Sequence, residues 1–177
     1  MTANSVHLHK VYARLSWLAA YFLNHYCRWF IVYAFAATAV FIFHQHFIFG
    51  INASPSLPYT LFLVHKGAPV ERGQLVAFRW NGAGPYPEGV TFVKIAAGVP
   101  GDRVVRDGRA FYVNGVFVGI AKTHTGLGRP LEVSAPGVLP PGHYYVAATH
   151  PDSLDSRYRM TGWIPQERII GRAYAIF

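Results

Sequence analysis

The chain has 177 residues and a mass of 19.7 kDa, which is enough for one domain of ordinary size and a short appendage. Apolar residues make up 52% and aromatic residues 16%, which is high for a soluble protein, and charged residues only 14%, so the composition indicates a membrane segment. The net charge of +8 forms no basic stripe, which argues against nucleic-acid binding, and the single cysteine, Cys27, excludes an internal disulfide framework.

Residues 1–28 form a basic segment that holds Lys10, Arg14 and Arg28 and no acidic residue. The apolar run within it, residues 15–23, has nine residues and is too short to span a bilayer. Its apolar residues recur at helical spacing. We therefore expect a cytoplasmic N-terminal segment with a helix lying on the membrane surface.

Residues 29–49 are a run of 21 residues with no formal charge at neutral pH. As a helix this run would cover about 32 Å, enough for the hydrocarbon core of a bilayer. Because the nearby positive charges all precede it, we expect a single-pass inner-membrane anchor with a cytoplasmic N-terminus and a periplasmic domain. A cleaved signal peptide is the alternative, but its charged region would be unusually long and its cleavage site poor.

Two histidine pairs, His7 with His9 and His44 with His46, raise the question of a metal site. Residues two apart on a helix point to nearly opposite sides, whereas metal ligands must converge on one point. We therefore expect no metal at either pair, and the sequence predicts no cofactor.

The anchor is followed by residues 52–58, which place Ser54 and Ser56 in a turn stiffened by prolines. A serine hydroxyl is a weak nucleophile and needs a neighbouring base to accept its proton. Serine between prolines is also ordinary turn chemistry, so this segment by itself does not identify a nucleophile.

Lys94 lies within an apolar stretch, residues 91–97, that we predict to be a strand. Alternation along a strand places Phe92, Lys94 and Ala96 on one face. Burial among apolar groups lowers the pKa of a lysine, and only a neutral lysine can act as a general base. The alternative is an edge-strand lysine that deters aggregation, or one whose charged end reaches water.

The rest of residues 50–177 has the pattern of an antiparallel β domain. We expect strands at 59–64, 74–80 and 142–148, and Gly/Pro-rich loops at 81–89 and 123–141. Residues 101–121 should form a three-stranded meander, because they contain Asp-Gly and Asn-Gly pairs at 107–108 and 114–115. The expected fold class is therefore mainly β with one N-terminal transmembrane helix, divided into segments 1–28, 29–49 and 50–177.

Three pieces of this domain, taken together and in this order, carry a specific resemblance. They are Asn-Ala-Ser-Pro-Ser-Leu-Pro at 52–58, Phe-Val-Lys-Ile-Ala-Ala-Gly-Val-Pro-Gly-Asp at 92–102 and Ser-Leu-Asp-Ser-Arg at 153–157. The chain resembles the membrane-bound serine peptidases of the signal peptidase I group over residues 50–177. It is most similar to the conjugative-transfer pilin peptidases of the TraF/TrhF type, and the resemblance implies a signal-peptidase-like β domain.

The resemblance also implies a role for each site residue. Ser56 would be the nucleophile and Lys94 the general base of a Ser/Lys dyad, and Ser153 would hold Lys94 in position. Asp155 and Arg157 would form a supporting ion pair, which from the sequence alone is equally an ordinary surface pair. Later pieces of the family pattern would be structural, and in this sequence they are Gly162, Pro165, Gly171, Arg172 and Ala173.

A neutral lysine accepts only one hydrogen bond and must be aimed, so a hydroxyl beside it is chemically sensible. The hydroxyl of Ser54 and the backbone N–H of Ser56 are expected to stabilise the oxyanion that forms during acyl transfer.

The substrate is indicated by two local features. The spacing of Ser56, Leu57 and Pro58 matches the pilin-peptidase branch, and residues 148–151 depart from the usual signal-peptidase sequence. The implied function is processing of a conjugative pilin precursor for a type IV secretion system, with cyclisation of the product left open. Alternatives are a general type I signal peptidase that cleaves exported preproteins, and a non-catalytic membrane assembly factor.

A Ser-His-Asp site is a further alternative, since four histidines fall in the β domain. The sequence has no Gly-x-Ser-x-Gly elbow, and no histidine has a distinctive context. The histidines considered are His65, His124, His143 and His150.

The expected partners are an exported protein substrate and membrane lipid, with no nucleic acid.

Overall fold

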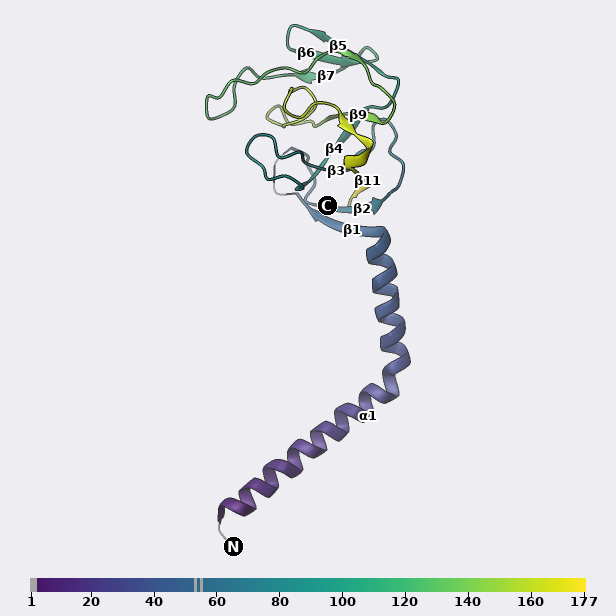
Figure 1. Ribbon diagram of the computed structural model, residues 1–177, viewed down its shortest axis with the longest axis vertical. Helices are drawn as coiled ribbons and strands as arrows, with labels where there is room; N and C mark the ends of the chain where they lie inside the picture. Colours follow the sequence, from purple (N-terminus) through teal and green to yellow (C-terminus); the bar gives the residue numbers. More distant parts are fainter. Residues whose placement is uncertain (1–2, 53, 55) are drawn as a thin grey trace. The chain divides into compact units, whose positions relative to one another are not determined.

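The computed structural model describes residues 3–52, 54 and 56–177, and it consists of a helical unit up to Gln45 and a β unit from His46 to Phe177 (Figure 1). The side chains of residues 3–11 and 13 are not described. The His7–His9 pair and the side chain of Lys10 therefore lie outside the described residues.

The helical unit is one element, α1, which runs from Ala3 to His46 over 44 residues. No glycine or proline interrupts this stretch, so nothing in it favours a break. The part from Arg14 to His46 is long and apolar enough to cross a membrane, judged by length and composition. The surface helix and the anchor expected at 1–28 and 29–49 thus belong to a single helix.

The end of the anchor differs from the sequence prediction. The apolar run places residues 47–49 in the membrane segment, but they begin strand β1, which runs from Phe47 to Ile51. Phe47 lies opposite His65 and Phe49 opposite Leu63 in an antiparallel pair with β2. Aromatic and β-branched residues suit a strand when a partner is at hand, and an apolar run by itself cannot reveal that partner.

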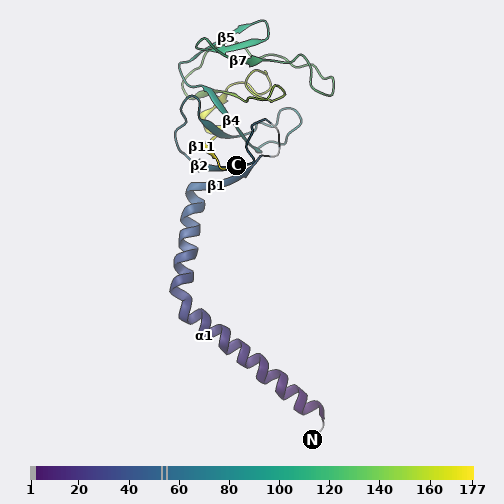
Figure 2. The same ribbon diagram turned by 180° about the vertical axis from the view of Figure 1, so that it is seen from behind.

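The β unit contains two antiparallel sheets. The large sheet has the order β1-β2-β11-β3-β4-β9-β10 and the small sheet the order β7-β6-β5-β8. The small sheet lies at one end of the unit and strands β1, β2 and β11 at the other, as both views show (Figures 1 and 2). The remaining bounds are β2 Leu61–Lys66, β3 Leu75–Arg79, β4 Thr91–Gly98, β5 Arg103–Asp107, β6 Ala110–Val113, β7 Val116–Ile120, β8 Gly137–Val138, β9 His143–Ala147, β10 Ile164–Pro165, the 3-10 turn η1 Gln166–Arg168 and β11 Ile169–Ala175.

The strands expected from the sequence are confirmed. β2, β3, β4 and β9 fall at the predicted positions, within a few residues, and β5, β6 and β7 form the expected meander. The turns of that meander contain Gly108 with φ 55°, Asn114 with φ 50° and Gly115 with φ 81°. These are the backbone conformations for which Asp-Gly and Asn-Gly pairs are favoured.

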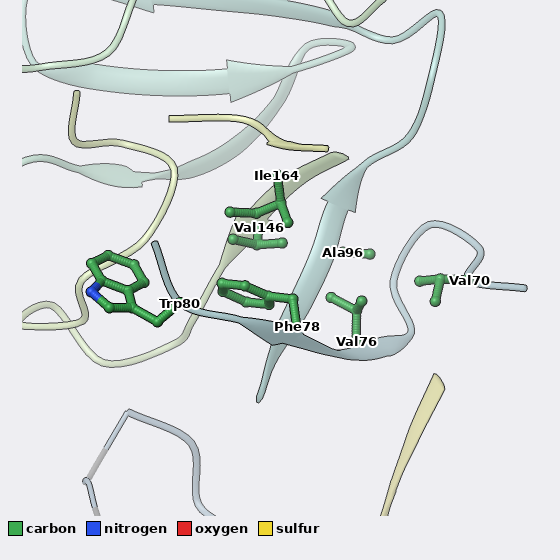
Figure 3. Packing of buried hydrophobic residues seen from close by; sticks show 7 residues of the cluster. All are labelled: Val70, Val76, Phe78, Trp80, Ala96, Val146 and Ile164. Atoms are coloured by element: carbon green, nitrogen blue, oxygen red, sulfur yellow. The ribbon is translucent and has the colours of Figure 1, made fainter. Parts of the chain in front are cut away.

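Both faces of the β4 region are packed, and this arrangement positions Lys94. On one face, Ala96 packs with β3 and β9 residues in the cluster drawn in Figure 3: Val70, Val76, Phe78, Trp80, Ala96, Val146 and Ile164. On the other face, Val93 and Ile95 pack against Leu57, Phe62 and Ala148. A residue of β4 that points into the first face is therefore removed from water.

Candidate active site

Lys94 is held in the interior by the strand that carries it. It is only 4% exposed, and β4 lies between β3 and β9 rather than at a sheet edge. As the alternation predicts, Lys94 and Ala96 are buried, and the Phe92 ring centroid lies 5.8 Å from Lys94 Nζ. The edge-strand interpretation of this lysine is therefore wrong.

Burial changes the acidity of Lys94. Desolvation lowers the pKa of its ammonium group to about 8. Asp155 acts in the opposite direction by attracting the ammonium, and Arg157 lowers the pKa further by repelling it. About a tenth of this lysine is therefore neutral at pH 7, and the neutral form is the state that a general base requires.

Ser153 supplies the hydrogen-bond partner of Lys94. The ammonium Nζ donates to Ser153 Oγ over 2.8 Å, and Ser153 is 3% exposed. The backbone N–H of Ser153 donates to the carbonyl of His150 over 3.1 Å, so a turn after β9 presents the hydroxyl. The contact is the one that the sequence resemblance implied.

Asp155 and Arg157 form a buried ion pair rather than a surface one. Their side chains are 0% and 3% exposed, and Arg157 donates to both carboxylate oxygens over 2.8 and 2.9 Å. Arg157 Nη1 also donates to the carbonyl of Ile120 over 3.0 Å, and the N–H of Ala148 donates to Asp155 over 3.2 Å. The pair therefore ties the end of β7 and the end of β9 to the segment that carries Ser153.

Close approach of β7 to this pair requires a glycine. A Cβ added at Gly119 would lie 2.8 Å from Arg157 Nη1. Any larger residue there would push the guanidinium away from the carbonyl of Ile120.

Ser54 and Ser56 lie together in the turn that follows β1. Their hydroxyl oxygens are 2.9 Å apart, and Ser56 is 7% exposed whereas Ser54 is exposed. One residue that the sequence analysis did not single out, Asn52, holds this turn. Its amide donates to the carbonyls of Leu57 and Tyr59 over 3.2 and 2.8 Å, and its oxygen accepts from the backbone N–H and hydroxyl of Ser54 over 3.1 and 3.2 Å.

The two halves of the site are connected by packing. Between Ser56 and Lys94, both within the described residues, there is no hydrogen bond: Ser56 Oγ is bonded to Ser54 and Lys94 Nζ to Ser153. Leu57 packs in one cluster with Val93 and Ile95, the residues on either side of Lys94. The serine turn is thereby anchored on the strand of the lysine, and the Ser/Lys dyad stays a prediction.

Asp102 is a second buried carboxylate that sequence reasoning placed in a motif without giving it a role. It accepts hydrogen bonds from Arg72 Nε over 2.9 Å, from the N–H of Val99 over 2.8 Å and from Asn114 Nδ2 over 2.8 Å. Burial raises the pKa of the Asp102 carboxyl, but these hydrogen bonds and the Arg72 charge outweigh it, and the pKa lies below its usual value. One carboxylate therefore joins three segments: the turn after β4, the turn before β3 that contains Arg72, and the β6–β7 hairpin.

The histidines of the β domain do not form part of the site. His65 stacks on Phe47 with ring centroids 4.7 Å apart, and His150 Nδ1 accepts from the N–H of Asp152 over 3.2 Å. Within the described part of the chain, no histidine hydrogen-bonds to Ser56.

Known proteins resemble this chain in sequence and in fold. A family model described as "Signal peptidase, peptidase S26" matches residues 23–177. Among solved structures, a signal peptidase I from Enterococcus faecalis is 22% identical, with 59% of this chain and 96% of that chain covered and a TM-score of 0.39. A likeness at that score says nothing about site geometry. Comparison with curated proteins finds no match.

Proposed function

The chain belongs to the signal peptidase family, peptidase S26, which is a family of serine peptidases, and we propose that it is a membrane-anchored serine peptidase with Ser56 as nucleophile and Lys94 as general base. The observation that supports this assignment best is the state of Lys94. The side chain is buried, its pKa is lowered to about 8, and its Nζ is held by Ser153 Oγ at 2.8 Å.

The proposed chemistry proceeds through an ester. Ser56 Oγ attacks the scissile carbonyl carbon while Lys94 Nζ takes the hydroxyl proton, and the tetrahedral oxyanion is stabilised by the Ser54 hydroxyl and the Ser56 N–H. Lys94 then gives its proton to the departing amine as the peptide bond breaks. Water or another amine, deprotonated in turn by Lys94, resolves the ester and restores the serine.

Membership of this family implies exported proteins as substrates. We propose more specifically that the substrate is a conjugative pilin precursor of a type IV secretion system, because the spacing of Ser56, Leu57 and Pro58 resembles the pilin-peptidase branch. An amine of the pilin itself could resolve the ester in place of water, since a well-oriented intramolecular amine reaches a very high effective concentration. The product would then be a cyclic pilin.

The same proposal includes an orientation. The charges that precede the apolar helix favour a cytoplasmic N-terminus, with the β unit on the periplasmic side. A reporter that is active only in the periplasm should work when fused after Phe177 and fail when fused at Arg14. The reverse result would place Ser56 in the cytoplasm, away from exported substrates.

Mass spectrometry of candidate pilins, from cells with and without the active protein, tests the function. Ser56→Ala and Lys94→Ala should each abolish processing, and the double variant should lose little more, because the residues act as one unit. Ser54→Ala should slow processing by about 10²-fold. Full activity in Ser56→Ala would exclude the assignment.

The same spectra separate the alternatives. A cyclic product is lighter by one water than the linear peptide of the same sequence, so linear pilin alone would leave a peptidase without cyclase activity. Unchanged pilin together with uncleaved exported preproteins would indicate a general signal peptidase. No change in any exported protein would favour the assembly factor.

A further inference from the structure

A groove of about 370 Å³ lies between the large sheet and the tip of the β6–β7 hairpin. β4 contributes Ile95 and Ala97 to its lining, and the end of β9 contributes Ala148. The hairpin contributes Val116 and Phe117. None of these residues has an assigned role in the chemistry proposed above.

The hairpin side of the groove is apolar and faces solvent. Val116 is 69% exposed and Phe117 is 56% exposed, although both are large apolar residues. Covering apolar side chains of this kind removes them from water, which is favourable, so the groove favours an apolar ligand group over water.

The groove reaches the candidate active site through the serine turn and β4. Ile95 directly follows Lys94 and lies on the other face of β4, where Ile95 and Ala148 pack with Leu57, the neighbour of Ser56. The N–H of Ala148 also donates to Asp155 over 3.2 Å. A peptide that leaves the serine turn along this face of β4 therefore reaches the groove.

Hydrogen bonds hold part of the groove lining in place. Arg72 and Asn114 line the groove, and both donate to the buried carboxylate of Asp102. Since Asp102 also accepts from the N–H of Val99, the hairpin tip is tied to the turn that follows β4. The groove is therefore held open by the fold before any ligand arrives.

We propose that this groove binds the part of the substrate that lies C-terminal to the scissile bond, by taking up a bulky apolar side chain. This inference rests on the proposed function. The scissile carbonyl oxygen must face Ser54 and Ser56, and the scissile nitrogen must face Lys94, which returns a proton to it. The chain beyond that nitrogen would pass from Lys94 to the face of β4 that carries Leu57, where Ile95 and Ala148 line the groove.

The test uses the full-length protein in detergent micelles and a mixture of peptides with randomised residues on both sides of every bond. Products are sequenced by mass spectrometry. Wild-type protein should enrich Leu, Phe, Val or Ile within the first few positions after the cleaved bond. Val116→Asp should reduce that enrichment by about fivefold or more, the factor that corresponds to about 1 kcal/mol, and leave the preference before the cleaved bond unchanged.

Val105→Asp is the matched control, because Val105 lies in β5 of the same small sheet, is 45% exposed and does not line the groove. It should behave as wild type. Phe117→Ser is a second groove variant and should act like Val116→Asp. Unchanged preferences in both groove variants would overturn the inference and leave the peptidase intact, whereas cleavage that persists in Ser56→Ala would overturn the proposed function and this inference with it.

Discussion

Burial of the charged Lys94 side chain lowers the free energy of unfolding. The pKa of Lys94 is lowered to about 8 from the ordinary value of 10.5, mainly because burial removes water from the ammonium group. Below about pH 8 the folded protein must hold a poorly solvated charge that the unfolded chain holds in water. Stability should therefore rise with pH between about 8 and 10.5, since the unfolded state binds more protons there.

Lys94→Met should increase stability at pH 7 while abolishing peptidase activity. The shift of the Lys94 pKa corresponds to at most about 3 kcal/mol, and methionine fills a similar volume without a charge. Chemical denaturation of the two proteins at pH 7 and pH 10.5 measures the effect. The difference should shrink at the higher pH, and an equal difference at both would mean that desolvation of the ammonium group is not its cause.

The pH dependence of wild-type activity should report the same pKa of Lys94. If neutral Lys94 is the base, the acid limb of kcat/KM against pH should have a midpoint near 8. A midpoint below 6 would point to a carboxylate or histidine as the base instead.

Arg157 and Arg159 provide a matched comparison of ion pairs, one buried and one exposed. Arg157→Met should destabilise the protein by about 3 to 5 kcal/mol, because it leaves the carboxylate of Asp155 buried without its partner. Arg159 pairs with Glu132, and these side chains are 76% and 71% exposed, so Arg159→Met should cost below about 1 kcal/mol. Urea unfolding measures both. Similar losses would mean that Asp155 finds another partner or ionises differently.

At the scale of secondary structure, β11 is the longest strand that the sequence analysis did not predict. It lies between β2 and β3 inside the large sheet, and Gly171 marks its irregular pairing with β3. A Cβ at Gly171 would lie 1.9 Å from the carbonyl oxygen of His65, so only glycine permits this approach. The resemblance named Gly171 as structural, and the contact supplies a physical reason.

Gly171→Ala should therefore destabilise the protein by more than about 4 kcal/mol or prevent folding. Gly126→Ala is the control, since a Cβ there would meet no atom within 4 Å. Circular dichroism and denaturant unfolding compare the two. A stable Gly171→Ala protein would show that β2 and β11 can separate without loss of the fold.

The sequence predicted those elements whose signal is local. The hairpins of β5, β6 and β7 follow from Asp-Gly and Asn-Gly pairs, which favour tight turns through their own backbone preferences. β1 and β11 depend on partners far along the chain, and the short strands β8 and β10 have two residues each. No local pattern contains that information.

The features of the candidate site also fall into two kinds, those that local sequence predicts and those that depend on distant residues. Burial of Lys94 follows from strand alternation, but its contact with Ser153, 59 residues later, was accessible only through the family resemblance. The role of Asn52 is carried by contacts within one turn, so a closer examination of polar side chains in residues 52–58 could have found it. The Asp102 cluster joins three turns that are separated in the sequence, so it could be recognised only from the folded structure.

At the scale of the whole molecule, the chain separates into a helix with exposed apolar side chains and a β unit with its own cores. The division falls between Gln45 and His46, so β1 belongs to the β unit although its sequence continues the apolar run. β1 covers the edge of β2 through five paired residues, from Phe47 opposite His65 to Ile51 opposite Leu61.

Two truncations should therefore behave differently. A protein that begins at His46 keeps β1 and should fold, but Phe49 and Ile51, which are 60% and 80% exposed, should make it dependent on detergent. A protein that begins at Asn52 lacks β1, exposes the hydrogen-bonding edge of β2 and should aggregate or unfold at lower denaturant concentration. Size-exclusion chromatography and urea unfolding in the same detergent compare them. Equal stability would show that β1 belongs functionally to the membrane helix, as the apolar run that ends at residue 49 suggests.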